Sequence, residues 1–308
     1  MKRSLLLLTV LMVFSSRAWT RQTQNHDARG LVLKVDPSHR TVLVSCDRIP
    51  DYMDAMVMSF DVRNVKELEG VGPGTMIDFS LVANSESVHI ENIRIHRYQS
   101  VEPDPLGARR LKLMSGIADP SLAAQIKVGD RVPDFTLIDQ NRQPVSLSQF
   151  KGTVVAITFT YTHCVLPNFC FRISNNFRRL QNRFASQMGK DLVLLTITFD
   201  PAHDTPEEMA KYGKTWNVNP KGWRLLSGSV PDVEKICHTF GLSFWPDEGV
   251  MVHSLHTILV DRNGNLSADI EGNEYNADQL GDLVQTLMVG TMVRTAHGPP
   301  QRVMHGPS

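Results

Sequence analysis

Cysteine is scarce in this sequence, with four residues in a chain of 308. That is far too few for a disulfide-stapled scaffold of this length, so the fold must depend on hydrophobic cores. Excess charge is also missing, because Lys plus Arg and Asp plus Glu both number 32. A net charge of zero gives no electrostatic reason to expect a nucleic-acid partner or broad attraction to membranes. The length is enough for two modest domains, each with its own core.

Long apolar runs are absent apart from one at the N-terminus. Lys2 and Arg3 precede an apolar run over residues 5–14, and small residues follow at 15–18. The run is shorter than the roughly 20 residues that cross a bilayer, and the whole pattern is typical of an export signal. We therefore predict a signal peptide over residues 1–20 and a periplasmic or otherwise extracytoplasmic location. The alternative is that the signal stays uncleaved and anchors the protein in a membrane.

Residues 29–97 are predicted to form a small all-β unit, an OB-like barrel. Apolar residues alternate in five short segments, and turns rich in Gly, Pro, Asn and Asp separate them. Alternation buries one face of each strand, and five short strands at this spacing are typical of a small barrel. The segments are 31–35, 41–44, 56–62, 76–82 and 88–95.

The pattern changes after the barrel. Proline, glycine and arginine over residues 98–127 predict a linker, and residues 128–289 then alternate buried strands with helices. Residues 290–308 are rich in Gly, Pro and His and are predicted to be a disordered tail. The α/β region is predicted to contain strands at 153–160, 192–199, 255–260 and 266–270, and helices at 173–184, 205 onward, 230–240 and 277–288.

The most informative pair of residues is Cys164 and Cys170, with five residues between them. They lie where a predicted buried strand ends and a helix begins. The amides and dipole of a helix N-terminus favour a thiolate, which is both a nucleophile and a soft metal ligand. A buried structural thiol needs no such position. In an oxidising compartment the pair could be a disulfide, a redox-active dithiol or part of a metal site.

A strand, a two-cysteine turn and a helix, placed early in an α/β domain, resemble a thioredoxin fold. Ordinary thioredoxins have two residues between the cysteines, and the proline expected ahead of a peroxidase cysteine is missing here. His253 lies just before a later strand, in the loop that faces the cysteine turn in a thioredoxin fold. Oxidoreductases normally place a cis-proline there. Two thiolates and one imidazole form a trigonal soft site suited to copper, so Cys164, Cys170 and His253 are predicted metal ligands.

Residues 128–289 resemble the Sco/SenC family of copper proteins that assist cytochrome oxidase assembly. The resemblance implies copper ligands at Cys164, Cys170 and His253, with the copper centre of a respiratory oxidase as acceptor. The chain departs from the family in having five residues rather than three between the cysteines. It also has Val252 where the family often has Asp, which removes one carboxylate that could orient the ligand. The matching stretches are 128–130 with 133–137, 160–164, 199–206, and 253–254 followed by 261–264.

Several neighbouring residues have both a functional and a structural interpretation. Asp200 and Asp204 occupy the acidic loop of the family, but they could simply cap the next helix and hold the loop. His256 is predicted to pack, since it points differently from His253. Cys237 is predicted to be a small buried hydrophobe on a helix. His163 adjoins Cys164 and could tune it or remain an exposed neutral side chain.

A second cluster lies in the barrel. Met56 and Met58 are two residues apart, so both thioethers face the same side of a strand, and Cys46 ends the preceding strand. One thiolate with two thioethers would suit Cu(I), although methionines also fill gaps in cores. The stretch resembles the CusF-like periplasmic copper carriers, whose ligands are a His and a Met-x-Met pair. That resemblance implies Cys46 in place of the His and Met53 in place of the aromatic residue that covers the metal. It rests on 49–50, 55–60 and 74–79.

These observations predict an extracytoplasmic copper metallochaperone. The barrel would capture Cu(I), and the thioredoxin-like domain would receive it and deliver it to an oxidase subunit. The alternative is a thiol-disulfide oxidoreductase that works without metal. There Cys164 and Cys170 form the redox-active pair, which keeps an acceptor's cysteines reduced, and the barrel is a docking module. A third interpretation is a copper-buffering or copper-sensing protein without catalytic activity.

Overall fold

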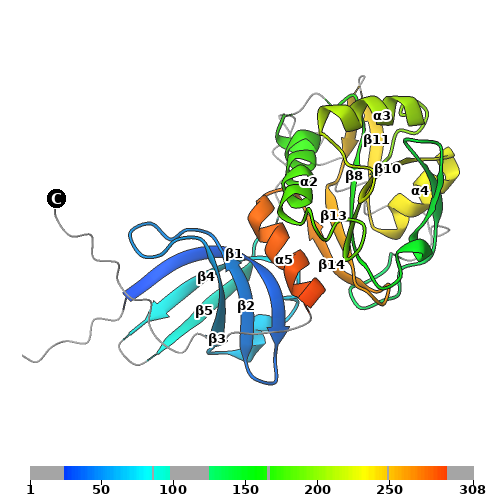
Figure 1. The fold of residues 1–308 in the computed structure, drawn as a ribbon. Helices are drawn as coiled ribbons and strands as arrows, with labels where there is room; N and C mark the ends of the chain where they lie inside the picture. Colours follow the sequence, from blue (N-terminus) through cyan, green and yellow to red (C-terminus); the bar gives the residue numbers. More distant parts are fainter. Residues whose placement is uncertain (1–23, 85–86, 98–124, 165–166, 248–249, 290–308) are drawn as a thin grey trace, which may run out of the picture.

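The computed structural model describes residues 24–84, 87–97, 125–164, 167–247 and 250–289, and Figure 1 shows its two units. The predicted signal peptide, the disordered tail and nearly all of the predicted linker lie outside these ranges. Within them, no helix is long and apolar enough to cross a membrane.

The first unit is a closed five-stranded barrel, as predicted, and its strand order is β1-β2-β3-β5-β4. A closed barrel leaves no free sheet edge, and its interior is filled by side chains such as Phe60, Leu81 and Ile90. The first strand begins at Gln24, earlier than the alternation indicated. The strands are β1 Gln24–Asp36, β2 Thr41–Cys46, β3 Met56–Val62, β4 Met76–Ala83 and β5 Val88–Ile95, and a short 3-10 turn, η1, spans Val65–Leu68.

The second unit is an α/β domain with a thioredoxin-like fold. Its seven-stranded sheet has the order β14-β13-β8-β9-β10-β6-β7, and a separate two-stranded ribbon pairs β11 with β12. The sheet strands are β6 Thr136–Asp139, β7 Pro144–Ser146, β8 Val154–Thr160, β9 Leu192–Thr198, β10 Trp223–Ser227, β13 His256–Val260 and β14 Leu266–Glu271. The ribbon consists of β11 Phe244–Asp247 and β12 Val250–His253. The helices are α2 Arg172–Arg183, α3 Pro206–Thr215, α4 Val230–Thr239 and α5 Ala277–Val289, with short turns η2 Leu147–Phe150 and η3 Pro167–Phe171.

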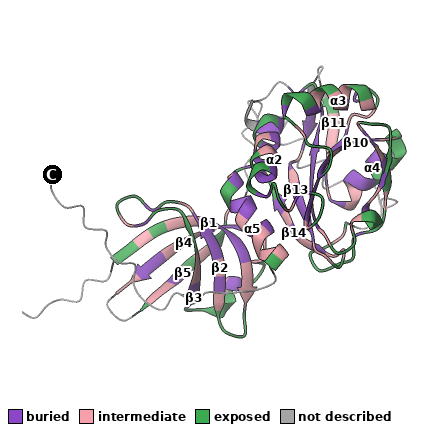
Figure 2. Cartoon of the chain, viewed as in Figure 1, coloured by how far each residue is buried: buried purple, intermediate pink, exposed green. Residues whose placement is uncertain are grey.

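The centre of the sheet explains why the cysteine turn is held in place. Every residue of β8 and β9 is buried, and the two strands run parallel through the middle of the domain (Figure 2). Helix α2 covers them with Ile173, Phe177 and Leu180, which recur at helical spacing. Because the cysteine turn follows β8 directly, it begins next to the two fully buried strands.

Candidate functional site

Cys164 and Cys170 lie on two different supports. Cys164 belongs to a turn directly after β8, in which its amide donates to the carbonyl of Tyr161 at 3.4 Å. Cys170 lies in the one-turn π-helix η3 immediately before α2. Neither forms a disulfide, and their exposed fractions are only 5% and 1%. The structure therefore brings the predicted pair together at the point where the sheet meets a helix.

Hydrogen bonds distinguish the two thiols. The Cys170 thiol donates to the Cys164 sulfur, and this bond together with burial raises the pKa of Cys170 well above its ordinary value. Burial, followed by the charge of Cys164 and a hydrogen bond to it, raises the pKa of Tyr161. Both donors point at one sulfur, so the arrangement favours holding a single negative charge at Cys164. A thiolate there is the form that attacks a disulfide or binds a soft metal.

The back of Cys170 is lined by hydroxyl groups. Hydrogen bonds from the Thr160 hydroxyl and the Tyr161 amide reach its sulfur. The Tyr212 hydroxyl lies 3.5 Å from that of Thr160 and 2.7 Å from that of Ser174, and burial raises the pKa of Tyr212 to about 12. A row of neutral hydroxyls therefore borders the buried thiol on the side of α2 and α3.

His253, the predicted imidazole ligand, ends strand β12. Its Nδ1 lies 2.9 Å from the carbonyl oxygen of Ser254, and donation of the Nδ1 proton would leave Nε2 with its lone pair. Aromatic rings surround the imidazole. Their centroids lie 4.7 Å away for Phe199, 6.0 Å for Tyr161 and 6.4 Å for Phe169. The histidine is thus held in an aromatic pocket, two of whose walls flank the cysteines in sequence.

The three predicted ligands converge on one region but do not form a closed group. Tyr161 connects them, because its hydroxyl bonds to Cys164 while its ring packs edge-on against His253. Among the described residues, no three or more His, Cys, Asp and Glu side chains are placed to hold a metal ion. The donor types still suit Cu(I), and a three-coordinate site would require His253 and the cysteine turn to move toward each other.

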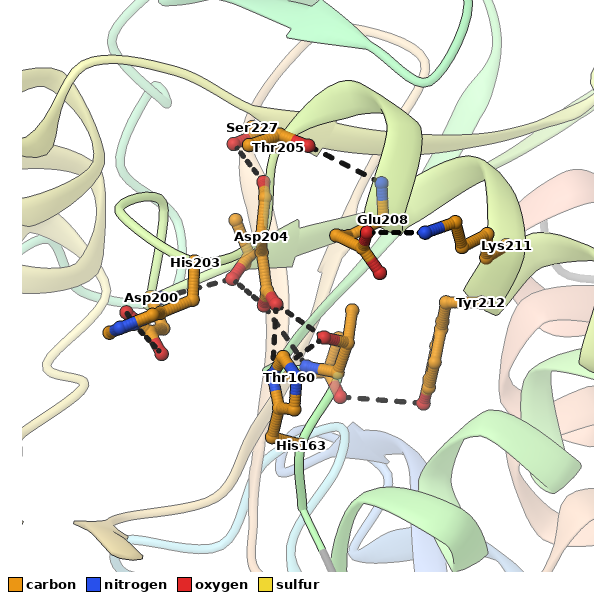
Figure 3. A network of polar contacts seen from close by, with 12 residues as sticks. Thr160, His163, Asp200, His203, Asp204, Thr205, Glu208, Lys211, Tyr212 and Ser227 are labelled. Carbon is orange, nitrogen blue, oxygen red and sulfur yellow. Dashed lines mark hydrogen bonds and ion pairs between the residues drawn. The ribbon is translucent and has the colours of Figure 1, made fainter. Parts of the chain in front are cut away.

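Asp204 holds the turn before Cys164 in place, and Figure 3 shows its contacts. Its carboxylate is fully buried and accepts from the Thr162 amide at 3.0 Å, the Thr162 hydroxyl at 2.5 Å and the Thr198 hydroxyl at 2.5 Å. Its carbonyl oxygen accepts from the Ser227 hydroxyl at 2.6 Å. One residue therefore ties the turn before Cys164 to the ends of β9 and β10, through its side chain and its backbone carbonyl.

The structure also shows the positions of the other residues that have both a functional and a structural interpretation. Asp200 contacts the exposed His203 at 2.9 Å, and Thr205, rather than either aspartate, caps α3. His163 is exposed, with Nδ1 3.9 Å from Asp204. His256 contacts Asp269 on the neighbouring strand at 2.9 Å, and Cys237 is completely buried on α4. His256 and Cys237 therefore occupy structural positions, as predicted.

The predicted barrel ligands, Cys46, Met56 and Met58, lie on the neighbouring strands β2 and β3. The register pairs Cys46 with Met56 and Val44 with Met58. Cys46 is 2% exposed, and burial raises its pKa to about 12. Met56 is half-exposed, while Met58 packs against the barrel core together with the buried Met53. The Met56 thioether is therefore partly exposed to solvent, whereas Met58 packs against the barrel core. The Cys46 thiol lies on the neighbouring strand β2.

Sequence reasoning missed Tyr161 and the hydroxyl row, and left the role of Asp204 open. Tyr161 follows a long run of buried β-branched residues, which gives no sign that its hydroxyl reaches a cysteine. Asp204 stands among other polar residues, Asp200 and His203 included, which look equivalent in the sequence. Only the fold shows that Asp204 is fully buried, whereas Asp200 is partly buried and His203 is exposed.

Comparisons with known proteins identify a family for each of the two units. Residues 123–288, more than half of the chain, match the sequence model of the family described as SCO1/SenC. Residues 25–95 match the model described as copper binding periplasmic protein CusF.

Two curated relatives match the second unit. An SCO2-like protein of Rickettsia typhi is 31% identical over 149 residues, which cover 45% of this chain and 68% of that protein. Protein sco1 of Schizosaccharomyces pombe is 30% identical over 152 residues, covering 47% of this chain and 56% of that one.

Solved structures include Arabidopsis thaliana ScoI with copper bound and yeast Sco1 with copper bound. The first is 22% identical with a TM-score of 0.44, covering 51% of this chain and 97% of that chain. The second is 22% identical with a TM-score of 0.44, covering 53% and 90%. Both resemblances noted in the sequence are confirmed by the family matches: a CusF copper-binding domain precedes a domain of the Sco type. The chain belongs to the SCO1/SenC family.

Proposed function

We propose that this protein is an extracytoplasmic copper metallochaperone that receives Cu(I) and delivers it to the copper centre of a respiratory oxidase. The observation that carries the proposal is the pair of touching thiols at the end of β8, next to a histidine held by the rings that flank them. Soft sulfur donors with one imidazole favour Cu(I) over harder ions. The periplasmic description of the CusF family and the predicted signal peptide support the location.

In this proposal copper is cargo, and the side chains of the second unit hold it. Cys164 would bind first, because two hydrogen-bond donors already favour negative charge on its sulfur. Cys170 would follow after losing its proton, and the free Nε2 of His253 would complete the site. Asp204 keeps the Cys164 turn fixed to the sheet, so that the adjustment falls on η3 and on the β11–β12 ribbon.

The barrel would bind copper first. We call its site, formed by Cys46, Met56 and Met58, the barrel station, and the site of Cys164, Cys170 and His253 the second-unit station. Met56 is exposed enough to meet copper arriving from solution or from another carrier, and Met58 lies one step deeper on the same face. Thioethers need not lose a proton to bind Cu(I), which suits a first contact. Cys46 would add a thiolate from the neighbouring strand in a second step, since its buried thiol must first give up its proton.

A thiol-disulfide oxidoreductase is the second candidate, and the hydrogen bond between the two thiols favours it. The Cys164 thiolate would attack one sulfur of an acceptor disulfide and release the other as a thiolate. The Cys170 thiolate would then attack the Cys164 sulfur, leaving a Cys164–Cys170 disulfide and a reduced acceptor. Two electrons pass from the pair to the acceptor, and no metal takes part.

Metal counting separates the two candidates. The reduced full chain without its signal is titrated anaerobically with Cu(I) against a chromogenic chelator, and bound copper is counted. Wild type should bind copper at two stations. His253→Ala should weaken the second-unit station most, and Met56→Ala/Met58→Ala the barrel station most. His163→Ala serves as the matched control, since this histidine also adjoins Cys164 but is exposed.

The proposal fails if His253→Ala leaves copper stoichiometry and affinity unchanged while the chain still reduces a model disulfide at the wild-type rate. That result would favour the oxidoreductase. If the variant Cys164→Ser/Cys170→Ser, in which the barrel residues are unchanged, binds no copper at either station, the barrel is removed from the proposal.

A further inference from the structure

Helix α5 lies between helix α2 and the barrel (Figure 1). Its contacts with α2 are made by arginines of α2. Arg183 donates to the Asp282 carboxylate at 2.7 Å and to the Asp278 carbonyl at 3.0 Å, and Arg179 pairs with the Asp278 carboxylate at 3.1 Å. Helix α2 is the helix that begins directly after the π turn holding Cys170.

Helix α5 also contacts the barrel beside Cys46. The Ser45 hydroxyl donates to Asp282 at 2.7 Å. The Gln279 amide donates to the Ser45 carbonyl at 3.2 Å and to the Asp47 carboxylate at 3.1 Å. Side chains alternate along a strand, so Ser45 faces α5 while Cys46 faces the barrel interior. The two residues that flank the predicted barrel ligand are therefore both bound to α5.

Asp282 joins the two sets of contacts. One of its carboxylate oxygens accepts from Arg183 of α2 and the other from Ser45 of the barrel. The preceding residue, Gly281, leaves room for this crossing, because a methyl group there would collide with the Arg183 guanidinium. Charge-assisted hydrogen bonds of this kind are about twice as strong as neutral ones.

A second bridge lies ahead of α5. The Glu274 carboxylate contacts His96 of the barrel at 2.7 Å, and its carbonyl oxygen accepts from Arg172 at 3.2 Å. Arg172 is the first residue of α2 and stands two positions after Cys170. The bridges at Asp282 and Glu274 thus bind both ends of α2 to the barrel through α5 and the residues before it.

We propose that α5 couples the two stations, so that the state of the Cys164–Cys170 pair changes the copper affinity of the barrel and the reverse. This inference rests on the proposed function. A ligand shifts an equilibrium only through contacts that differ between two states, and η3 provides such a difference. Cys170 lies in η3 directly before α2, and a disulfide would bring its sulfur from hydrogen-bonding distance to about 2 Å from the Cys164 sulfur, so we expect oxidation to move η3 and the start of α2. The contacts of α5 would then transmit this movement to Ser45 and Asp47, the residues on either side of Cys46.

The test measures Cu(I) affinity of the barrel with the pair in two fixed states. One sample is the full chain without its signal, oxidised to the Cys164–Cys170 disulfide, and the other is Cys164→Ser/Cys170→Ser. In both, only the barrel can bind copper, and affinity is read anaerobically by chelator competition. We expect the two affinities to differ by about five-fold or more, the lower end of typical coupling. Asp282→Asn combined with Glu274→Gln weakens both bridges and should bring that ratio close to one.

Two further variants keep the test decisive. Ser45→Ala removes only the barrel half of the bridge and replaces Asp282→Asn if that variant does not fold. Glu207→Gln is the control, because it removes an ion pair with Arg142 that lies away from α5. With the bridges intact, equal affinities in the disulfide sample and in Cys164→Ser/Cys170→Ser overturn the coupling, and so does a ratio that survives the bridge variants. Absence of barrel copper in either state overturns the barrel's place in the proposed function instead.

Discussion

At the scale of single residues, the site depends on one buried carboxylate and on one tyrosine hydroxyl. Asp204 accepts three hydrogen bonds in the interior, and this is the compensation that a buried charge requires. Tyr161 orients charge at Cys164 and touches His253. Neither residue is among the predicted ligands, yet both determine where the ligands stand.

Asp204→Asn tests the first of these roles. Asparagine keeps the shape of the side chain but offers only one oxygen to three donors. At least one donor is therefore left facing the NH2 group of the amide. We expect a loss of about 2 kcal/mol in unfolding free energy, the typical cost for a hydrogen bond to a charged group. Urea denaturation measures this loss. Glu207→Gln, at the exposed ion pair, should leave the midpoint almost unchanged, and an equal shift in both variants would contradict the assignment.

Tyr161→Phe tests the second role. Removing the hydroxyl takes one donor from the Cys164 sulfur, so a thiolate there becomes less stable. We expect alkylation of Cys164 by iodoacetamide to slow by about ten-fold in the reduced, folded chain, in line with one charged hydrogen bond. Mass spectrometry of peptides follows each cysteine. Tyr212→Phe, which lies behind Cys170, should not slow Cys164. An unchanged Cys164 rate in Tyr161→Phe would show that the hydroxyl plays no part.

His256 gives a pH dependence with a defined sign. Burial opposes its protonation, but the hydrogen bond and charge of Asp269 outweigh burial, and the pKa of His256 is raised in the folded state. Its ion pair therefore stabilises the fold fully below about pH 6.5, the ordinary histidine pKa, and the contribution is lost as pH rises through the folded pKa. The stability difference between wild type and His256→Gln should shrink between pH 6 and pH 9 in urea titrations. A difference that grows with pH would contradict this sign.

Much of the residue-scale site was predictable from the sequence. The cysteines were found because a buried strand followed by a helix places them at a helix start, and the methionines because period-two spacing places them on one face. The separation of His253 from the cysteines was not predictable. It depends on how Phe169, Phe199 and Tyr161 pack around the imidazole, and those contacts join segments distant in sequence.

At the scale of elements, long periodic segments were predictable and short ones were not. Strands β3 and β5 have their predicted bounds, and α5 differs by a single residue at its end. Strands β6, β7 and β10 and the β11–β12 ribbon were missed. Each spans only three to five residues, too few to establish a period, and their pairing with distant strands decides their conformation. The ribbon matters most, because β12 ends at His253.

Ser254→Ala tests how the ribbon is closed. The Ser254 hydroxyl accepts from the Ser243 amide at 3.0 Å, and the Ser254 amide donates to the Ser243 carbonyl at 2.8 Å. Removing the hydroxyl leaves the Ser243 amide without its acceptor, at a cost of about 1 kcal/mol. Hydrogen exchange at Ser243 should become several-fold faster. Ser243→Ala keeps the amide and the Ser254 hydroxyl, so slow exchange should persist there, and fast exchange in both would refute the assignment.

At the scale of the whole molecule, the two units are packed against each other rather than merely tethered. Leu31, Leu33 and Met76 of the barrel are buried within the same apolar cluster as Leu280 and Leu283 of α5. The sequence predicted a linker and two separate cores, and nothing in the alternation of β1 indicated that its outer face would also be covered. A strand apolar on both faces, as at residues 31–33, is the only available signal.

Gly74 of the barrel lies against strand β14 of the second unit, and this contact gives the corresponding prediction. Its φ is +88°, and an added Cβ would lie 3.0 Å from Ala268 and 3.1 Å from Ile270 of β14. Gly74→Val therefore combines backbone strain with a collision across the interface, and β-branching makes both worse. We expect the single calorimetric transition of wild type to separate into two, because the units lose the contact that makes unfolding cooperative. Gly72→Val is the matched control, since no atom lies within 4 Å of its added Cβ and its φ is not in the left-handed region. Two transitions already present in wild type, or a split in both variants, would mean that the packed interface does not bind the units into one cooperative structure.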